Sequence, residues 1–372
     1  MGEWESAMES MELNKLFSGV YKDKRVLVTG HTGFKGSWLS MWLTFMGAQV
    51  SGISLEPNTS PSHWNLLNLD IDSHIQDIRD IAGLKRIVDD IQPEIIFHLA
   101  AQPIVRLSYD QPHETYETNV MGTINLLEVV RTNPSIKAVV VVTSDKCYDN
   151  REWDWGYREN EAMGGKDPYS CSKGCAELIV ASYRHSYFSG GSCKTLIASA
   201  RAGNVIGGGD WAQDRILTDI VLAAKDLNQV LLRNPKATRP WQHVLEPLSG
   251  YLALGEKLLY GESSFAEAWN FGPHQSNNVS VQELVTESAK SWSEISLSID
   301  KGTHPHEAKF LMLDSTKAMK RLKWTPVWGF SETVANTINW YREFYQSGTV
   351  LSPDNLKKYV EDAQTQGVSW SI

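Results

Sequence analysis

Cysteine is scarce in this chain, and its spacing excludes two kinds of structural site. The 372 residues contain four cysteines, with no CxxC pair and no histidine partner at metal-site spacing: Cys147, Cys171, Cys175 and Cys193. Cys171 and Cys175 stand four residues apart on an expected helix, where we interpret them as reduced packing residues. The sequence therefore predicts neither a disulfide framework nor a bound metal.

Long apolar runs and basic runs are also missing. The apolar stretches fall short of the roughly 20 residues that span a bilayer, and the acidic segment 1–16 lacks the pattern of a signal peptide. No cluster of Lys and Arg indicates a nucleic-acid partner. We therefore expect a cytoplasmic protein that binds neither membrane nor nucleic acid. Acidic residues outnumber basic ones by 44 to 35, so any anionic ligand needs positive charge concentrated at its site.

What the sequence does contain is an alternation of apolar strands and helical stretches. We expect strands at 25–29, 48–55, 94–98, 137–143 and 195–200, and helices at 37–46, 81–91, 112–131 and 168–185. Apolar strands separated by helices are typical of a parallel sheet covered on both faces. The predicted fold class is α/β, a doubly wound parallel sheet of the Rossmann type.

This alternation of strands and helices ends after about residue 201, where glycines and prolines separate shorter elements. A chain of this length has room for two lobes. We assign 1–16 to an N-terminal extension, 17–200 to the Rossmann domain, 201–345 mainly to a smaller mixed α/β substrate-binding lobe, and 346–372 to a C-terminal extension. Some segments of 201–345 are expected to return to the Rossmann sheet.

Three glycines lie between the first expected strand and the first expected helix. Gly30, Gly33 and Gly36 form GxxGxxG at this position, together with Thr32 and Phe34. Such a loop turns sharply and brings backbone amides and a helix N-terminus to a pyrophosphate. A merely structural turn is the alternative, but the placement favours a dinucleotide-binding loop.

Later strand ends complete the expected cofactor site. Ser54 occupies the usual place of the acid that holds an adenine ribose, and Glu56 follows it. No Lys or Arg occurs between Lys35 and Arg79, which favours NAD over NADP because a clamp for a 2′-phosphate is missing there. The other expected contacts are Asp77, Ile78, Leu99, Ala100 and Ala101. For the last three, plain strand-to-loop packing is the alternative.

Tyr169 and Lys173 form a YxxxK motif on the helix expected at 168–185. Residues four apart share a helix face, so the ammonium can lie near the phenol. A nearby cation favours the phenolate of a tyrosine whose ordinary pKa is about 10, which would give a base usable near neutral pH. An isolated YxxxK is common on surface helices, but its position in this fold favours catalysis.

A second polar group comes at the end of the strand expected at 137–143. Thr143, Ser144, Asp145 and Lys146 stand at a carboxyl end, where α/β sheets place their chemistry. They offer a hydroxyl, an acid and a possible base. A polar turn with a solvated Asp–Lys pair is the alternative.

These motifs together resemble the extended short-chain dehydrogenase/reductase family, and within it the nucleotide-sugar dehydratases and epimerases. The strings that carry the resemblance are VTGHTGFKGSWL (28–39), HLAAQPIVRLSY (98–109), TSDKCY (143–148) and ARAGNVIGGGDW (200–211). The likeness covers about 17–345 and is strongest to dehydratases that act on CDP-glucose. The glycine loop and YxxxK identify only the broad superfamily, whereas TSDK is more specific.

The resemblance implies a cycle of oxidation, elimination and reduction. Tyr169, assisted by Lys173 and Ser144, would remove the proton of the glucose C4 hydroxyl while hydride passes to NAD. Water would then leave across C5 and C6 with Asp145 as the acid, and hydride would return to C6 to give CDP-4-keto-6-deoxyglucose. Related dTDP-glucose enzymes carry Glu where this chain has Lys146, and a lysine can remove the C5 proton only when it is neutral.

For the substrate diphosphate, arginine is the best match because it contacts phosphate oxygens in pairs. The candidates for substrate binding are Arg106, Arg201, Asn204, Arg233 and Arg239. Each arginine alone could instead be a surface or salt-bridge residue. Asn119, in the helix expected at 112–131, is interpreted as a structural or water-relay residue.

Two other functions remain open. A nucleotide-sugar 4-epimerase would need Tyr169, Lys173 and NAD but no acid and base for C5 and C6. A non-catalytic NAD-binding protein would need the glycine loop but neither Tyr169 nor Lys173. By resemblance we also expect a homodimer or higher homo-oligomer. Helices 112–131 and 168–185 would form its interface, or else they only cover the sheet. The resemblance also implies a place in deoxysugar biosynthesis for bacterial surface polysaccharides such as the lipopolysaccharide O-antigen.

Overall fold

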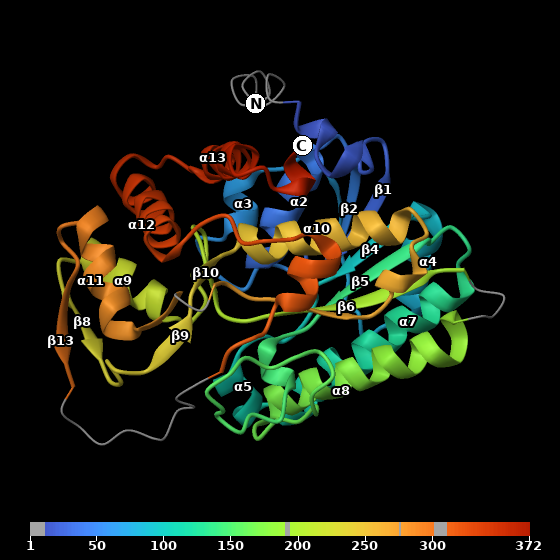
Figure 1. Ribbon diagram of the computed structural model, residues 1–372, viewed down its shortest axis with the longest axis horizontal. Coiled ribbons are helices and arrows are strands. Elements are labelled where there is room, and N and C mark those ends of the chain that lie inside the picture. The colour runs from blue at the N-terminus through green and yellow to red at the C-terminus, as the bar shows by residue number, and fades with distance from the viewer. Residues whose placement is uncertain (1–11, 190–193, 275–276, 301–310) are drawn as a thin grey trace.

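The computed structural model describes residues 12–189, 194–274, 277–300 and 311–372. Its centre is a seven-stranded sheet with the order β11-β6-β5-β4-β1-β2-β3 in the described residues (Figure 1). All neighbouring pairs are parallel. The strands are β1 (Arg25–Thr29), β2 (Gln49–Ser54), β3 (Asp72–Ile75), β4 (Ile95–His98), β5 (Ala138–Val142), β6 (Leu196–Ala202) and β11 (Ala268–Phe271). Cys193 and residues 1–11 of the expected N-terminal extension lie outside the described residues.

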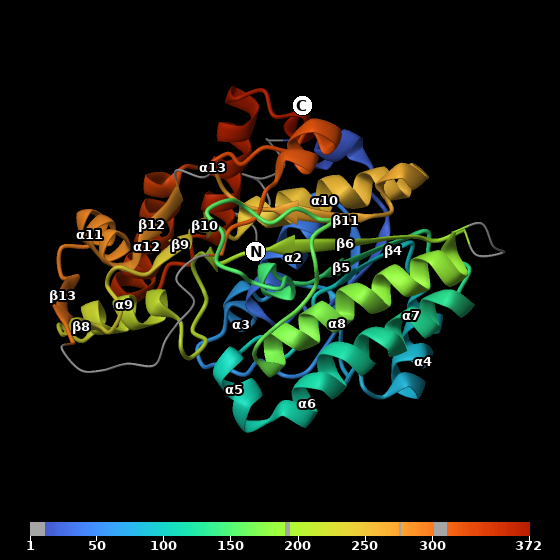
Figure 2. The same ribbon diagram turned by 60° about the horizontal axis from the view of Figure 1, so that its bottom comes forward.

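Helices cover both faces of this sheet, which confirms the doubly wound α/β prediction. Figure 2 shows α7 (Gly122–Thr132) and α8 (Pro168–Tyr183) along one side and α10 (Leu245–Leu259) along the other. α4 (Ile81–Ile91) packs beside α7, and α2 (Phe34–Phe45) lies on the face of α10. Because successive strand residues point to opposite faces, Val26 and Val28 enter one core and Leu27 the other.

The second lobe has a hydrophobic core of its own. It contains α9 (Ile216–Lys225), α11 (Val281–Ser291) and α12 (Phe330–Ser347), with the strand pairs β7 (Val205–Ile206) and β10 (Gln242–His243), β8 (Gln229–Leu232) and β13 (Ser296–Ile299), and β9 (Thr238–Pro240) and β12 (Asn278–Ser280). Between β10 and β12 the chain returns to the large sheet, where α10 covers one face and β11 forms an edge strand.

Local signals explain where α8 begins. The Asp167 side chain accepts a hydrogen bond from the Ser170 amide at 2.9 Å, and Pro168 occupies the first turn, so α8 begins where the sequence predicts. The helix expected at 112–131 is present as α6 (Pro112–Tyr116), a π-helical turn at Glu117–Met121, and α7. The connecting helices α3 (His63–Leu67) and α5 (Val105–Asp110) were not expected.

The C-terminal segment packs into the main core. α13 (Ser352–Thr365) contributes Tyr359, and Trp370 stacks on Phe17 with ring centroids 5.2 Å apart. Residues expected to form an extension therefore bury large aromatic rings against the face of α2 and α10. Among the described helices, none combines the length and apolar character needed to cross a membrane.

Candidate active site

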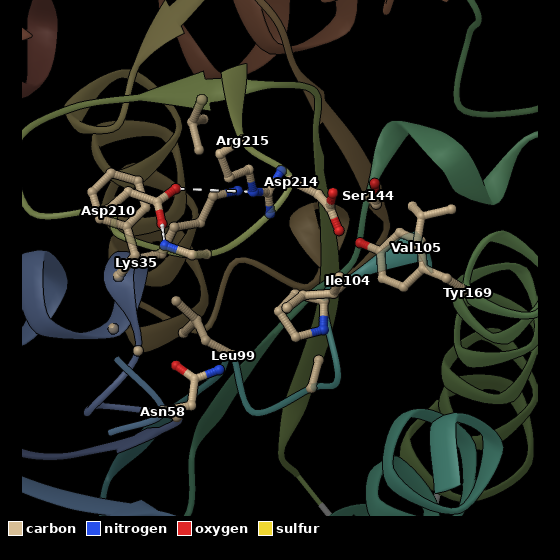
Figure 3. A pocket seen from close by; sticks show the side chains of 18 of the residues that line it. Lys35, Asn58, Leu99, Ile104, Val105, Ser144, Tyr169, Asp210, Asp214 and Arg215 are labelled. Atoms are coloured by element: carbon tan, nitrogen blue, oxygen red, sulfur yellow. Dashed lines mark hydrogen bonds and ion pairs between the residues drawn. The ribbon is translucent and has the colours of Figure 1, made fainter. Parts of the chain in front are cut away.

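A cavity of about 960 Å³ opens at the carboxyl ends of the central strands and extends to the second lobe (Figure 3). Parallel α/β sheets bind ligands at this edge. The cavity is lined by residues that directly follow or end β1, β2, β4, β5 and β6, and by the loop before α9. Its size suits a ligand larger than one nucleotide.

The glycine loop forms a cradle that only glycine permits. Gly30 has φ +77°, and a Cβ there would lie 2.7 Å from the Ala100 backbone nitrogen. A Cβ on Gly36 would lie 2.0 Å from the Gly30 carbonyl oxygen. Gly33 is the N-cap residue of α2 and has no side chain that could accept a hydrogen bond. The first backbone amides of this helix, which line the cavity, therefore carry no side-chain cap. This arrangement fits the pyrophosphate of a dinucleotide.

All residues expected to contact the cofactor line the cavity: Gly30, Thr32, Gly33, Phe34, Gly36, Ser54, Asp77, Ile78, Leu99, Ala100, Ala101, Thr143, Tyr169 and Lys173. Thr32 Oγ1 contacts Ser54 Oγ at 2.8 Å and donates to the Leu55 carbonyl at 2.8 Å, which ties the glycine loop to the end of β2. Glu56 also lines this part of the cavity. The lining therefore fits a dinucleotide that runs from β2 to the YxxxK helix.

The expected catalytic residues all line the cavity: Ser144, Asp145, Lys146, Tyr169 and Lys173. Ser144 Oγ donates to Asp145 Oδ1 at 3.0 Å and accepts from the Lys146 amide at 3.3 Å. The phenol of Tyr169 points toward Ser144 (Figure 3), whose hydroxyl lowers the pKa of the phenol. The alternative of a solvated polar turn does not fit, because Ser144 and Asp145 are buried.

Burial controls the titration of these groups. It raises the pKa of Tyr169 to about 12, against the opposing effects of the Ser144 hydrogen bond and the Arg215 charge. The expectation that the pKa of Tyr169 is lowered toward neutrality is therefore wrong, since desolvation outweighs the nearby positive charge. Burial lowers the pKa of Lys173 to about 8, although Glu177 opposes this. Burial also raises the pKa of Asp145, against the Lys146 charge, which suits a carboxyl that donates a proton.

Lys35, Asp210 and Arg215 are charged residues of the cavity that the sequence analysis did not assign. Lys35, in the first turn of α2, lies with Asp210 across the cavity from Tyr169, and Arg215 reaches into the space between them (Figure 3). Arg215 Nε is 4.0 Å from Asp210 Oδ2. Burial lowers the pKa of Lys35 to about 8, further lowered by Arg215 and raised by Asp145. Its place inside the GxxGxxG motif was an available signal for Lys35, whereas nothing in the sequence pattern marks Arg215.

The substrate-binding candidates divide into two groups. Arg106, Asn204, Arg233 and Arg239 line the cavity. Arg106 also donates to Asp214 Oδ1 at 2.6 Å, which links α5 to the loop before α9.

For Arg201 the structure shows the alternative, a salt-bridge role, and not the candidate role of diphosphate ligand. Its side chain is 4% exposed, does not line the cavity, and pairs with Glu177 at 2.7 Å. It belongs to β6, and its side chain points into the protein interior beneath the catalytic helix.

Asn119 has the structural role expected of it. Its Oδ1 accepts from the Gln102 amide at 2.8 Å, and its Nδ2 donates to Ser172 Oγ at 2.9 Å. Asn119 lies in the π-helical turn between α6 and α7, a deviation that often occurs near functional sites. It therefore joins the loop after β4 to the YxxxK helix.

This fold and this site define a class of NAD(P)-type sugar-nucleotide enzymes, and comparison with known proteins identifies the family. The family model described as GDP-mannose 4,6 dehydratase matches residues 27–337, so the chain belongs to this family of nucleotide-sugar dehydratases. The chain is 52% identical over 337 residues to the CDP-glucose 4,6-dehydratase of Salmonella typhimurium, covering 89% of this chain and 94% of that protein.

Solved structures share the fold at lower identity. An epimerase from Methanothermobacter thermautotrophicus superimposes with a TM-score of 0.78 at 23% identity, covering 91% of this chain and 97% of the other. A dTDP-glucose 4,6-dehydratase from Streptomyces venezuelae with NAD bound gives a TM-score of 0.70 at 24% identity, covering 86% and 97%. These matches confirm the Rossmann-type architecture.

Proposed function

We propose that this protein is a hydro-lyase that converts CDP-glucose to CDP-4-keto-6-deoxyglucose with NAD as a tightly bound cofactor. The observation that carries the proposal is that Asp145 and Lys146 line the same cavity as Tyr169 and Lys173. A second support is the 52% identity to a CDP-glucose 4,6-dehydratase.

The residues that fit the cofactor are those of the glycine loop and the ends of β2 and β4. When bound, NAD supplies an acceptor for the C4 hydride of the sugar and a donor that returns it at C6. Lys173, one helical turn after Tyr169, supplies the ammonium beside the cofactor ribose and the phenol. Lys35 and Arg215 add positive charge to the cavity of an otherwise acidic protein.

In the first step Tyr169 takes the proton of the C4 hydroxyl. Burial raises the pKa of its phenol to about 12, although the Ser144 hydroxyl and the Arg215 charge lower it. Ser144 donates a hydrogen bond to Asp145 and lies beside the Tyr169 phenol, so the base for C4 and the acid for C6 are neighbours. The C4 ketone then acidifies the C5 proton.

In the elimination step Asp145 donates a proton to the departing C6 hydroxyl. Burial favours the protonated carboxyl that this role requires. Lys146, the next residue, is the candidate that removes the C5 proton. Arg233, Arg239 and Asn204 hold the nucleotide diphosphate from the second lobe.

The geometry favours dehydration over the two alternatives. A 4-epimerase has no use for a buried acid beside the catalytic tyrosine, yet Asp145 is 3% exposed and bonded to Ser144. A non-catalytic NAD-binding protein has no use for the YxxxK residues, which both line the cavity.

The test is incubation of the purified protein and NAD with CDP-, dTDP-, UDP- and GDP-glucose, followed by mass spectrometry of the products. We expect CDP-glucose to lose one water and gain a ketone. A product of unchanged mass with inverted C4 would establish the epimerase instead. Unreacted sugars in the presence of bound NAD would support the non-catalytic function.

The proposal includes a cytoplasmic location and a homo-oligomer. The described cysteines Cys147, Cys171 and Cys175 are all free thiols, which suits a reducing compartment. Met121 and Leu178 are exposed on the neighbouring helical segments 112–131 and 168–185, which are the expected dimer interface. The product class is a precursor of deoxysugars for surface polysaccharides such as the O-antigen. Sedimentation analysis measures the oligomeric state.

A further inference from the structure

A buried carboxylate lies on the catalytic helix one turn beyond the YxxxK lysine. Tyr169, Lys173 and Glu177 follow one another at intervals of four residues along α8, so the three side chains share one face. Glu177 is 3% exposed and Lys173 is 6% exposed. Nothing in the dehydration cycle described above uses Glu177.

Glu177 ties α8 to two strands of the sheet. Its Oε1 accepts a short hydrogen bond from Thr143 Oγ1, at the end of β5. Its Oε2 accepts from Ser199 Oγ at 2.7 Å and from Arg201 Nη2 at 2.7 Å, both on β6. The carboxylate is therefore fully engaged, and its Thr143 contact fixes the residue immediately before Ser144 and Asp145.

Arg201 holds the other end of the same segment. Its Nη1 donates to Tyr148 Oη at 2.6 Å, and its guanidinium lies 4.9 Å from the centroid of the Tyr148 ring. Tyr148 in turn donates to Asn270 Oδ1 at 2.8 Å on β11. Glu177 and Arg201 therefore hold both ends of the segment 143–148 by hydrogen bonds to Thr143 and Tyr148. This segment contains Ser144, Asp145 and Lys146.

A buried ion pair is weak evidence for stability, because desolvation of both charges offsets their attraction. Its position beside Lys173 suggests a different role. Burial alone would raise the pKa of Glu177, but Arg201 and the hydrogen bonds from Thr143 and Ser199 keep it below the ordinary value. Glu177 therefore remains an anion at neutral pH.

The other titratable groups around Lys173 supply no such anion. His98, on β4, is neutral because burial lowers its pKa to about 3. Cys147 is a neutral thiol because burial raises its pKa well above the ordinary value. Tyr169 is a neutral phenol in the ligand-free site, and Lys35 is a cation that opposes the charge of Lys173. Glu177 is the anion that acts on Lys173 among these described neighbours.

We propose that Glu177 and Arg201 are positioning residues for the dehydration: they clamp residues 143–148 against the catalytic helix and hold a permanent negative charge next to Lys173. The clamp keeps the C4 base and the C6 acid in one geometry. The charge keeps the Lys173 ammonium present at the pH at which the phenolate of Tyr169 is needed. The catalytic purpose rests on the proposed function, but the electrostatic effect on Lys173 does not.

The test is an NMR titration of Lys173 in the full-length protein labelled with 13Cε-lysine, with the signal assigned from a Lys173→Arg variant. The key variant is the double substitution Glu177→Gln with Arg201→Met, which removes both charges and leaves neither buried alone. A charge one helical turn away acts strongly at low dielectric, so we expect the Lys173 midpoint to fall by about 1 pH unit. The single variant Glu177→Asp keeps the charge, so its Lys173 midpoint should be that of the wild type.

The matched control is Glu246→Gln, which replaces a fully buried carboxyl on α10, on the other face of the sheet. It should leave the Lys173 midpoint unchanged. A folded double variant whose Lys173 titrates as in the wild type would overturn the proposal. So would an equal fall in Glu246→Gln, because that would indicate general loosening. The titration needs neither substrate nor cofactor, so it stays informative if CDP-glucose proves not to be the substrate.

Discussion

The sharpest prediction concerns Gly36, because the structure gives the size of the perturbation. In Gly36→Ala the new methyl carbon would lie 2.0 Å from the Gly30 carbonyl oxygen, and also within 2.8 Å of two backbone carbons of Gly30 and His31. Ordinary contact begins near 3.4 Å, so the loop and α2 must separate by about 1.4 Å. No side-chain rotation can relieve the clash, because every contacted atom belongs to the backbone.

Two opposing effects decide the outcome. Alanine is favoured over glycine inside a helix by only about 1 kcal/mol. Displacing an oriented binding group by about 1 Å can cost roughly 100-fold. We therefore expect Gly36→Ala to weaken NAD binding by about 100-fold or more, because the displaced amides are those that would face the pyrophosphate. Isothermal titration calorimetry with NAD gives the affinity, and a thermal melt shows whether the protein remains folded.

Gly83→Ala is the matched control. Gly83 also lies in a helix, α4, but the three atoms nearest to the added carbon, at 2.5 to 2.7 Å, all belong to the side chains of Asp80 and Gln76, which can move. Its NAD affinity should stay close to that of the wild type. A folded Gly36→Ala protein that binds NAD within about threefold of the wild type would refute the cradle described for the glycine loop.

Three further predictions concern the reaction. Lys146→Ala should permit the C4 oxidation but stall elimination, so that absorbance of reduced cofactor accumulates without dehydrated product; near-normal turnover would remove Lys146 from the mechanism. Burial lowers the Lys173 pKa from its ordinary value to about 8, so the ammonium is present below that pH and is lost above it. The dehydration rate should accordingly fall as the pH rises through about 8, and a flat profile up to pH 10 would contradict the role of the ammonium. Arg239→Gln should raise KM for CDP-glucose about 10-fold with little change in kcat, because a diphosphate contact is present in both ground and transition states; steady-state kinetics would show an unchanged KM if Arg239 serves only the structure.

Strand and helix positions were predictable because the pattern is strong in the first half of the chain. The helix predicted at 81–91 is observed at Ile81–Ile91, and the strand predicted at 137–143 is observed at Ala138–Val142. β3 was missed because Asp72–Ile75 is short and largely exposed, so no apolar run marks it. The sequence predicted only that some segment of 201–345 returns to the sheet. It did not identify β11, because so short a run is recognisable as a strand only from its pairing with β6.

The cofactor residues were predictable for a related reason. Strand ends in a parallel sheet converge at one edge, so the position of a residue along the chain also gives its position in space. Asp210 and Arg215 come from a loop of the second lobe, where no such rule applies, and their approach to Lys35 depends on how that lobe packs.

Arg201 shows where reasoning from charge alone goes wrong. The sequence offers Arg201 as a candidate diphosphate ligand, with a salt-bridge role as the alternative, but it lies within β6, whose residues from Ile197 to Ala202 are all buried. An arginine at a buried position needs an anion nearby, since an unpaired charge there would cost several kcal/mol. The sequence did contain that partner: Glu177 continues the spacing of Tyr169 and Lys173 by one more turn of the same helix. A carboxylate on the buried face of a catalytic helix and an arginine on a buried strand each require the other. Together these two residues therefore predict an internal ion pair, and this interpretation takes precedence over a ligand-binding role for Arg201.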